Sequence, residues 1–198
     1  MKQYNFDEII PREDTDCVKY DLRKLFFGTD DVLPMWVADM DFRTPDFIID
    51  ALKSRLDHEI LGYTFRGKEF NQAISGWMEK RHGWKIKDSW LSFSPGVVPA
   101  VNMLVLAFTK PGDKIIIQPP VYFPFFSAVK KNDRTLVENP LKLENNRLNM
   151  DLDDLAVKAK DAKMLIISHP HNPGGSVWTR DELTGMAEIC LENDVIMV

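Results

Sequence analysis

The stretch from Met164 to Trp178 constrains the fold of this chain more than any other. It begins with four consecutive apolar residues, Met164–Ile167, a pattern typical of a strand that is buried on both faces. The next eight residues, 168–175, contain two prolines, two glycines and an asparagine, so they can neither extend the strand nor begin a helix at low cost. Open α/β sheets bind ligands in polar loops at the carboxyl ends of buried strands. We therefore expect a ligand site at this loop.

From residue 90 onward, the sequence alternates between expected strands and expected helices. We expect strands at 90–93, 114–118, 134–138 and 164–167, helices at 97–108, 125–131, 151–161 and 179–193, and the start of a strand at 195–198. The last helix has a capping box, because Glu182 stands three residues after Thr179. Such alternation predicts an α/β fold with a mostly parallel sheet and helices on both faces. The loops 94–98, 118–124 and 168–175 then follow strands and should lie on one edge of the sheet.

Composition limits the classes of partner that the chain can bind. With 198 residues, of which 44% are hydrophobic and 28% charged, the chain can form one sizeable core. The net charge of −5 argues against nucleic acid or an acidic membrane surface as the main partner. No apolar run approaches the roughly 20 residues of a membrane-spanning helix. The acidic N-terminus does not resemble a signal peptide, and Cys17 and Cys190 are far apart, so we expect a cytoplasmic location.

The three loops differ in the chemistry that they offer. Gly96, Val97 and Val98 begin a helix, whose free backbone amides favour an anion such as a phosphate, although many such turns bind nothing. Tyr122 lies in a proline-rich loop that could hold its ring for stacking on a flat ligand, but a tyrosine of the core is an equally good interpretation. Asn172 could donate its amide to a ligand oxygen, or it could be a turn residue.

Two other kinds of site are disfavoured. His169 and His171 resemble a metal pair, but the local sequence offers no third ligand, and zinc sites use three or four. We therefore predict no metal site and regard both histidines as incidental. The chain has neither a G-x-G-x-x-G nor a G-x-x-x-x-G-K-[ST] pattern, which removes the usual support for a nucleotide-binding domain.

Five short motifs occur in a fixed order along the chain. They are PMWVADMDF at 34–42, GYTFRG at 62–67, SPGVVP at 94–99, PPVYFPFF at 119–126 and HPHNPGG at 169–175. In this order they resemble the class I/II aminotransferase family, and most of all its cystathionine β-lyase (C–S lyase) branch. The resemblance runs from about residue 30 to the end. It implies a pyridoxal 5′-phosphate (PLP) enzyme of fold type I, in which residues 1–45 form an N-terminal arm with the start of the small-domain or substrate-loop segment, and 46–198 form the first part of the PLP-binding large domain.

The resemblance also implies roles for particular residues. The amides of Gly96, Val97 and Val98 would hold the phosphate of PLP, and the ring of Tyr122 would stack on its pyridine ring. Asn172 would bond the phenolic oxygen of PLP and contribute to substrate binding.

Two residues nearer the N-terminus complete this set. Ala38 would lie near the carboxylate of the substrate. Tyr63 would contact the substrate and reach the phosphate of the partner subunit's PLP, which implies a homodimer with a shared active site.

The expected reaction is α,β-elimination of a sulfur amino acid to pyruvate, ammonia and a thiol, and aminotransfer is the alternative. In the family, the Schiff-base lysine follows the part of the sequence seen here. The chain also ends on the apolar residues 195–198. We therefore expect the catalytic lysine beyond Val198 and little activity from these 198 residues alone. If 198 residues is the natural length, a non-catalytic scaffold becomes the better hypothesis.

Overall fold

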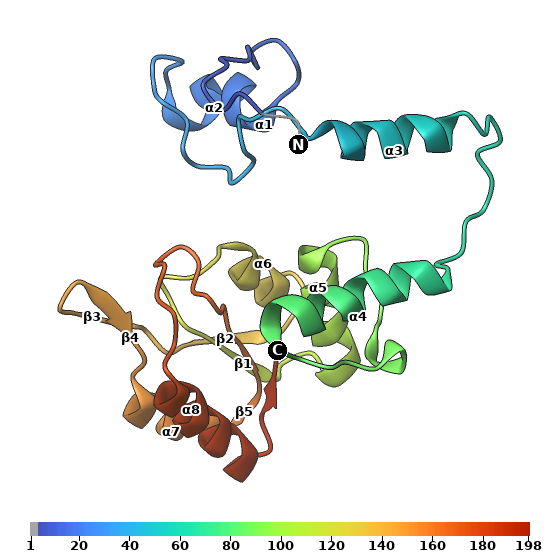
Figure 1. The fold of residues 1–198 in the computed structure, drawn as a ribbon. Coiled ribbons are helices and arrows are strands. Elements are labelled where there is room, and N and C mark those ends of the chain that lie inside the picture. Colours follow the sequence, from blue (N-terminus) through green and yellow to red (C-terminus); the bar gives the residue numbers. More distant parts are fainter. Residues whose placement is uncertain (1–3) are drawn as a thin grey trace. The chain divides into compact units, whose positions relative to one another are not determined.

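The computed structural model describes residues 4–198 (Figure 1). The chain divides into two compact units, Met1–Lys68 and Glu69–Val198. Among the described residues, no helix is both long enough and apolar enough to cross a membrane. The predicted division into domains 1–45 and 46–198 stays a prediction.

Residues 4–68 of the first unit form three helices, α1 (Val18–Asp21), α2 (Arg23–Phe27) and α3 (Asp46–Leu56). Helices α1 and α2 have four and five residues, which is too short to repeat an apolar face, so no periodic pattern in the sequence indicates them. The ring of Trp36 lies 4.8 Å from that of Phe26 and 5.5 Å from that of Phe27. The segment 34–42 therefore packs an aromatic side chain against α2.

The second unit is built on a four-stranded parallel sheet with the strand order β2-β1-β5-β6. Its strands are β1 (Lys114–Ile117), β2 (Thr135–Glu138), β5 (Ala162–Ile166) and β6 (Ile196–Met197), and its helices are α4 (Lys68–His82), α5 (Val97–Phe108), α6 (Pro124–Lys130), α7 (Leu152–Ala159) and α8 (Arg180–Glu192). An antiparallel hairpin, β3 (Lys142–Glu144) with β4 (Arg147–Asn149), connects β2 to α7. The predicted parallel α/β sheet is confirmed.

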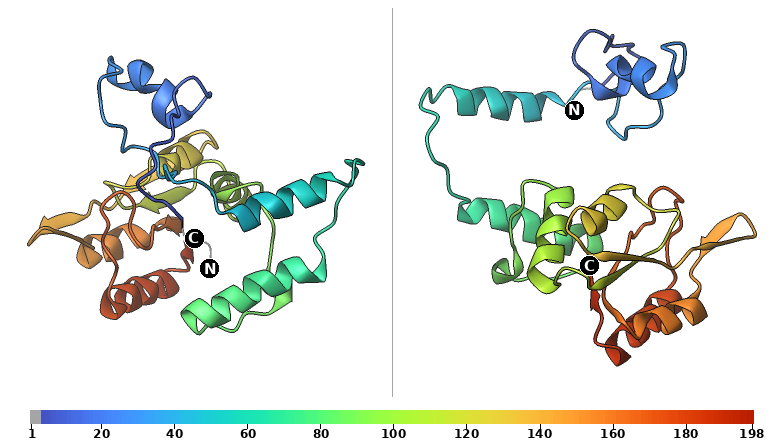
Figure 2. Two further views of the ribbon diagram at one scale, coloured as in Figure 1. Left: turned by 45° about the horizontal axis from the view of Figure 1, so that its top comes forward. Right: turned by 180° about the vertical axis from the view of Figure 1, so that it is seen from behind.

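Strand β1 shows why the sheet is covered on both faces. Ile115 and Ile117 belong to a core cluster with side chains of α5 and α6, whereas Ile116 belongs to a second cluster with side chains of α7 and α8. All three isoleucines are fully buried. Because successive strand residues point to opposite faces, an unbroken apolar run requires helices on both sides, as Figures 1 and 2 show.

The strand predicted at 90–93 is wrong. Residues Asp88–Trp90 form a short 3₁₀ helix, and Leu91 is extended, but no strand within residues 4–198 pairs with 91–93. An extended segment becomes part of a sheet only if its backbone hydrogen bonds find a neighbouring strand. Local composition cannot report such a neighbour. Of the three loops expected after strands, only 118–124 and 168–175 therefore follow one.

Hydrogen bonds of one buried amide side chain, that of Asn139, connect elements at the carboxyl end of the sheet. Asn139, which is completely buried after β2, accepts a hydrogen bond of 3.0 Å from Nε2 of Gln118, which follows β1. Its own amide donates to the carbonyl of Asp151 at 3.0 Å and to a carboxylate oxygen of Asp154 at 2.7 Å. These contacts connect two strand ends to the start of α7.

We predict that Asn139→Leu, which preserves size but removes the amide, lowers the free energy of unfolding by about 2–3 kcal/mol, because buried polar partners lose their hydrogen bonds. Urea denaturation measures the change. Glu144→Gln, on an exposed strand of the hairpin, is the control and should stay within about 0.5 kcal/mol of the wild type. Equal losses of unfolding free energy in the two variants would contradict the structural role of the Asn139 hydrogen bonds.

Candidate active site

Two loops meet at the carboxyl edge of the sheet. Strands β1 and β5 are parallel neighbours, so the loop after β1 (118–123) and the loop after β5 (167–179) emerge side by side. A hydrogen bond of 2.7 Å joins them, from Nε2 of His171 to the carbonyl oxygen of Pro120. A carbonyl oxygen only accepts, so Nε2 of His171 carries the proton. The loop of Asn172 is thereby attached directly to the loop of Tyr122.

His171 is held in place on its other side as well. Its side chain is only 4% exposed, and its ring centroid lies 5.2 Å from that of Trp178. Trp178, itself 3% exposed, donates from Nε1 to the carbonyl of Ser168 at 2.9 Å. Sequence reasoning took His171 as incidental, and the structure shows that this is wrong, because His171 connects two loops. No local signal could have shown this role, because the partner of His171 lies 51 positions earlier in the chain.

The turn between these residues presents Asn172 outward. Its backbone amide donates to Oγ of Ser168 at 3.0 Å, while the amide of Gly175 donates to the carbonyl of His171 at 2.8 Å. The Asn172 side chain is exposed and makes no hydrogen bond within residues 4–198. An Asx turn, the alternative interpretation of this residue, is therefore not present in the described part of the chain. The loop holds the backbone and leaves the amide free for a ligand.

Tyr122 is half-buried at the start of the turn into α6. Its ring lies 5.8 Å from that of Phe125, edge to face, and 5.6 Å from that of Phe123. It also packs against the core cluster that contains Val101 and Val105 of α5. One part of the ring is therefore fixed by the core, while the rest is accessible, which suits an aromatic platform.

The N-terminus of α5 offers backbone amides to an anion. Gly96 is the N-cap residue with φ of 143°, a conformation that other residues rarely adopt. The amide of Ala100 donates to the carbonyl of Gly96, and Pro99 has no amide. Within residues 4–198, the amides of Gly96, Val97 and Val98 donate to no backbone carbonyl, as is usual for the first amides of a helix. The predicted anion site at this turn thus has three backbone donors and the helix dipole.

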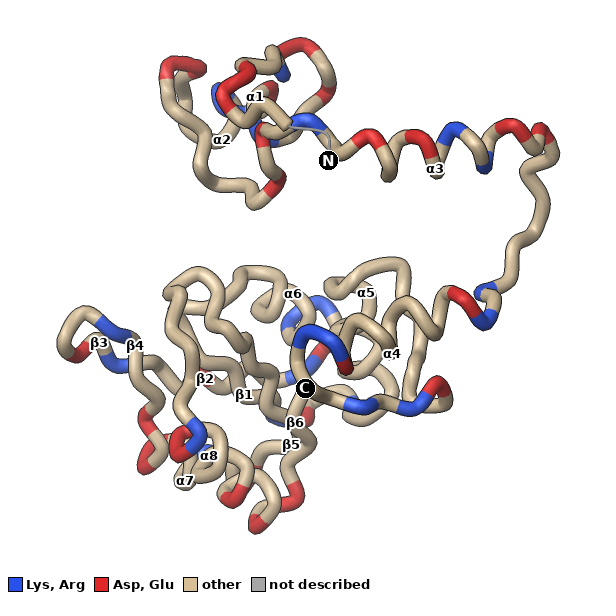
Figure 3. Tube along the Cα trace, in the orientation of Figure 1, with Lys and Arg blue, Asp and Glu red and all other residues tan. Residues whose placement is uncertain are grey.

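No charged side chain lies in these loops. Residues 94–98, 118–124 and 168–178 contain no lysine, arginine, aspartate or glutamate, and Figure 3 shows the corresponding segments without blue or red. An anionic ligand bound to these loops would therefore be held by amide dipoles instead of by charged side chains of the loops.

The β3–β4 hairpin supports the 167–179 loop from outside. Arg147 donates to both carboxylate oxygens of Glu182, at 2.8 and 2.7 Å, and to the carbonyl of Val177 at 3.0 Å. Its guanidinium also lies 5.7 Å from the ring centroid of Trp178. A Cβ on Gly174 would come within 2.2 Å of Cδ1 of Leu148, so the hairpin and the loop are in close contact at that glycine.

Glu182 has two roles in this support. It completes the predicted capping box of α8, since its carboxylate accepts from the amide of Thr179 while its own amide donates to the Thr179 hydroxyl. The hydrogen bonds from Arg147 are the largest cause that lowers the pKa of Glu182 to about 2. The ionised form of Glu182 is therefore strongly favoured in the folded chain.

The other two predicted site residues belong to the first unit. Ala38 is exposed in the segment 34–42, and Tyr63 is fully exposed in the loop 62–67, which has neither helix nor strand. The structure thus brings together the loops of Tyr122 and Asn172, and it places Ala38 and Tyr63 in a unit described separately. Within residues 4–198, no group of three or more histidine, cysteine, aspartate or glutamate side chains could hold a metal ion.

Comparison with known proteins identifies the class of protein to which this fold and site belong. The sequence profile described as "Aminotransferase class I and II" matches residues 30–198, and the chain belongs to this family.

Individual relatives narrow the comparison. The chain is 47% identical to the cystathionine β-lyase PatB of Bacillus subtilis over 196 residues, which cover 98% of this chain and 51% of that protein. A PLP-bound structure from Clostridium difficile 630, named as an aminotransferase, is 48% identical with a TM-score of 0.93. The match covers 98% of this chain and 51% of that protein. The PLP-bound C–S lyase of Staphylococcus hominis is 38% identical with a TM-score of 0.90; the match covers 99% of this chain and 50% of that protein. The chain spans about half the length of these relatives.

We predict that Glu182→Gln destabilises the protein in a pH-dependent way. The folded state lowers the pKa of Glu182 from 4.5 to about 2, so the stabilisation is present above pH 4.5 and is lost as the pH falls toward 2. At neutral pH the variant should lose roughly 2–3 kcal/mol of unfolding free energy. Urea denaturation at several pH values measures this difference, with Glu188→Gln, exposed on the same helix, as the control. A loss that does not shrink in acid would argue against the ion pair as its source.

Proposed function

We propose that this chain forms the PLP-binding part of a C–S β-lyase, an enzyme that converts a sulfur amino acid to pyruvate, ammonia and a thiol. The observation that carries the proposal is the hydrogen bond from His171 to Pro120, which holds the loops of Asn172 and Tyr122 together at the edge of the sheet. Family membership and the names of the C–S lyases among its relatives support the same reaction.

The residues of the two joined loops and of the N-terminus of α5 fit PLP. The free amides of Gly96, Val97 and Val98 suit its phosphate, because they offer several donors without a competing carboxylate. The half-buried ring of Tyr122 suits stacking on the pyridine ring, and the exposed amide of Asn172 suits the phenolic oxygen. Bound PLP supplies an electron sink that stabilises negative charge at the Cα of an amino acid. The residues of this chain would hold and orient the cofactor.

The proposal includes substrate and partner contacts. Ala38 would lie near the substrate's carboxylate, because its small side chain lets a ligand approach the backbone. Tyr63, which is fully exposed, would reach the phosphate of PLP bound to the partner subunit. Tyr63 and Asn172 would both contact the substrate. The enzyme would therefore be a homodimer with a shared active site. A cytoplasmic location belongs to the same proposal.

The lysine that attaches PLP covalently would come from sequence that follows Val198. Three lysines of the second unit, Lys114, Lys142 and Lys158, each form an ion pair with an aspartate, at 3.2, 2.6 and 2.5 Å. A protonated, paired lysine is a poor nucleophile. On this proposal, residues 1–198 alone bind PLP without covalent attachment and have little activity.

Aminotransfer is the second candidate reaction. The family name and the aminotransferase name given to the Clostridium difficile structure favour it. Both reactions begin with removal of the proton from Cα, so the residues that hold the cofactor are the same for both.

The assay that separates the two reactions uses the PLP-loaded enzyme with cystathionine. We expect release of pyruvate and of a thiol in equal amounts. Transfer of the amino group to a keto acid without release of thiol would contradict the lyase and support the aminotransferase. A non-catalytic scaffold would instead be favoured by two observations together. The protein purified from its native cells would have a mass of 22.8 kDa, and borohydride treatment would attach PLP to none of its lysines.

We predict that His171→Phe weakens PLP binding about tenfold, because the loop of Asn172 is no longer bonded to that of Tyr122. Absorbance titration with PLP measures the affinity without turnover. His171→Gln, which retains a donor, should restore part of the affinity. His169→Phe is the matched control, since His169 is exposed in the same loop. Equal effects of the two phenylalanine variants would show that His171 does not position the site.

A further inference from the structure

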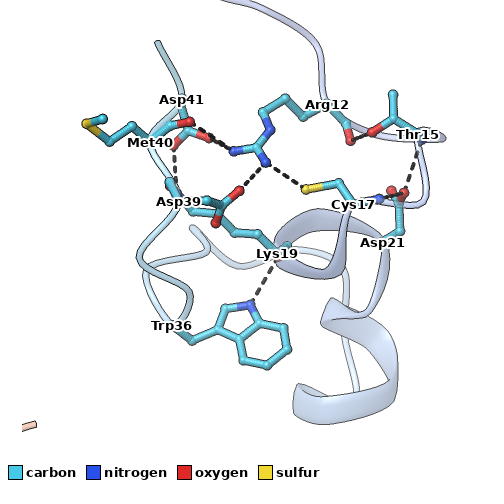
Figure 4. A network of polar contacts seen from close by, with 9 residues as sticks. All are labelled: Arg12, Thr15, Cys17, Lys19, Asp21, Trp36, Asp39, Met40 and Asp41. Atoms are coloured by element: carbon cyan, nitrogen blue, oxygen red, sulfur yellow. Dashed lines mark hydrogen bonds and ion pairs between the residues drawn. The ribbon is translucent and has the colours of Figure 1, made fainter. Parts of the chain in front are cut away.

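A compact network of charges in the first unit holds the segment that contains Ala38 (Figure 4). The guanidinium of Arg12 donates to a carboxylate oxygen of Asp39, to Oδ1 of Asp41 at 2.6 Å and to the carbonyl of Met40 at 3.4 Å. One side chain thus contacts three consecutive residues that lie 27 to 29 positions further along the chain.

A second cation acts on the same two aspartates. Nζ of Lys19 donates to Oδ2 of Asp41 at 2.8 Å and to the carbonyl of Asp39 at 3.0 Å. Lys19 is only 6% exposed, and lysine is rarely buried unless it is paired. Its own carbonyl accepts a hydrogen bond of 3.0 Å from Nε1 of Trp36, as Figure 4 shows. The segment 36–41 is therefore attached to the region of α1 at several points.

The geometry of Arg12 is not one that lysine could reproduce. Its guanidinium divides its donors between two carboxylates, lies 5.4 Å from the ring centroid of Tyr20, and places one nitrogen 3.0 Å from Sγ of Cys17. A planar guanidinium has several donors in a fixed arrangement and can bond both carboxylates at once, whereas an ammonium acts as a point charge. The hydrogen bonds, those to Asp39 first, raise the pKa of Arg12, and those from Lys19 and Arg12 lower the pKa of Asp41. The charged forms of Arg12 and Asp41 are therefore favoured, and in this network two basic side chains face two acidic ones.

We propose that Arg12 is a positioning residue for substrate binding, which fixes the segment beside Ala38 and cancels the negative charge of Asp39. This inference rests on the proposed function, because it needs an amino-acid carboxylate near Ala38. Asp39 is the next residue in the chain, so an unbalanced carboxylate there would repel the carboxylate of the substrate. The ligand class is the α-carboxylate of an amino acid, and Arg12 acts on it through Asp39 without touching it.

The experiment compares Arg12→Met with Arg43→Met in the PLP-loaded enzyme. Arg43 forms an exposed ion pair with Glu8 in the same unit, so its loss removes the same charge from a pair that includes neither Asp39 nor Asp41. Arg12→Met should raise KM for cystathionine about tenfold and leave kcat and PLP affinity within about twofold, and Arg43→Met should change neither. The double variant Arg12→Met with Asp39→Asn should recover part of the KM, because it removes the repelling charge.

A measurement without turnover accompanies the kinetics. Chymotrypsin cleavage after Trp36 and Phe42, mapped by mass spectrometry, should be faster in Arg12→Met than in the wild type or in Arg43→Met. Arg12→Lys retains the charge and should give an intermediate KM, which keeps the test decisive if Arg12→Met does not fold.

Two results would overturn the inference. An unchanged KM in Arg12→Met and Arg12→Lys would exclude a role in substrate binding, and a raised KM that Asp39→Asn does not relieve would exclude the charge argument. A wild-type enzyme that releases neither pyruvate nor thiol would contradict the proposed function instead. The cleavage measurement then still decides whether Arg12 holds the segment, and equal cleavage in all variants would show that it does not.

Discussion

The parallel pairing of β1 with β5 is the constraint on which the second unit depends. It places Ile115, Ile116 and Ile117 opposite Met164, Leu165 and Ile166 in the centre of the sheet, where side chains of both faces are buried by helices. The same pairing brings the loops that follow the two strands to one edge, close enough for His171 to bond Pro120. Burial of apolar surface fixes the strands, and the strands fix the site.

The candidate site is rigid in its backbone and open in its functional side chains. Prolines, the Trp178–Ser168 hydrogen bond and the Arg147–Glu182 pair hold the loops, while Asn172 and part of Tyr122 face outward. The loops carry no charge of their own, and the charged groups lie in supporting positions. The first unit is similar in this respect, because Arg12 and Lys19 form ion pairs with Asp39 and Asp41 and donate to backbone carbonyls close to Ala38 in the sequence. In both units, an arginine side chain holds a loop segment through hydrogen bonds to carboxylates and to backbone carbonyls.

Much of the fold was predictable from local pattern. The helix Val97–Phe108 and the capping box of Thr179 and Glu182 appear where the sequence places them, since short-range propensities determine both. The strand expected at 90–93 does not form, because a strand also needs a partner that its own composition cannot reveal. Among the site residues, the outward position of Asn172 agrees with a ligand role, but the part played by His171 was missed. Its hydrogen bond spans 51 positions, beyond the reach of any local pattern.

By itself, the sequence determined the α/β class, the alternation of strands and helices after residue 114 and the family, because apolar runs, turn residues and ordered motifs are properties of neighbouring residues. Only the tertiary structure decided which loops meet, that His171 joins them, and that Arg12 and Lys19 neutralise Asp39 and Asp41. These contacts connect residues that are more than 20 positions apart. Their partners are selected by strand pairing and packing in three dimensions, which no window of the sequence contains.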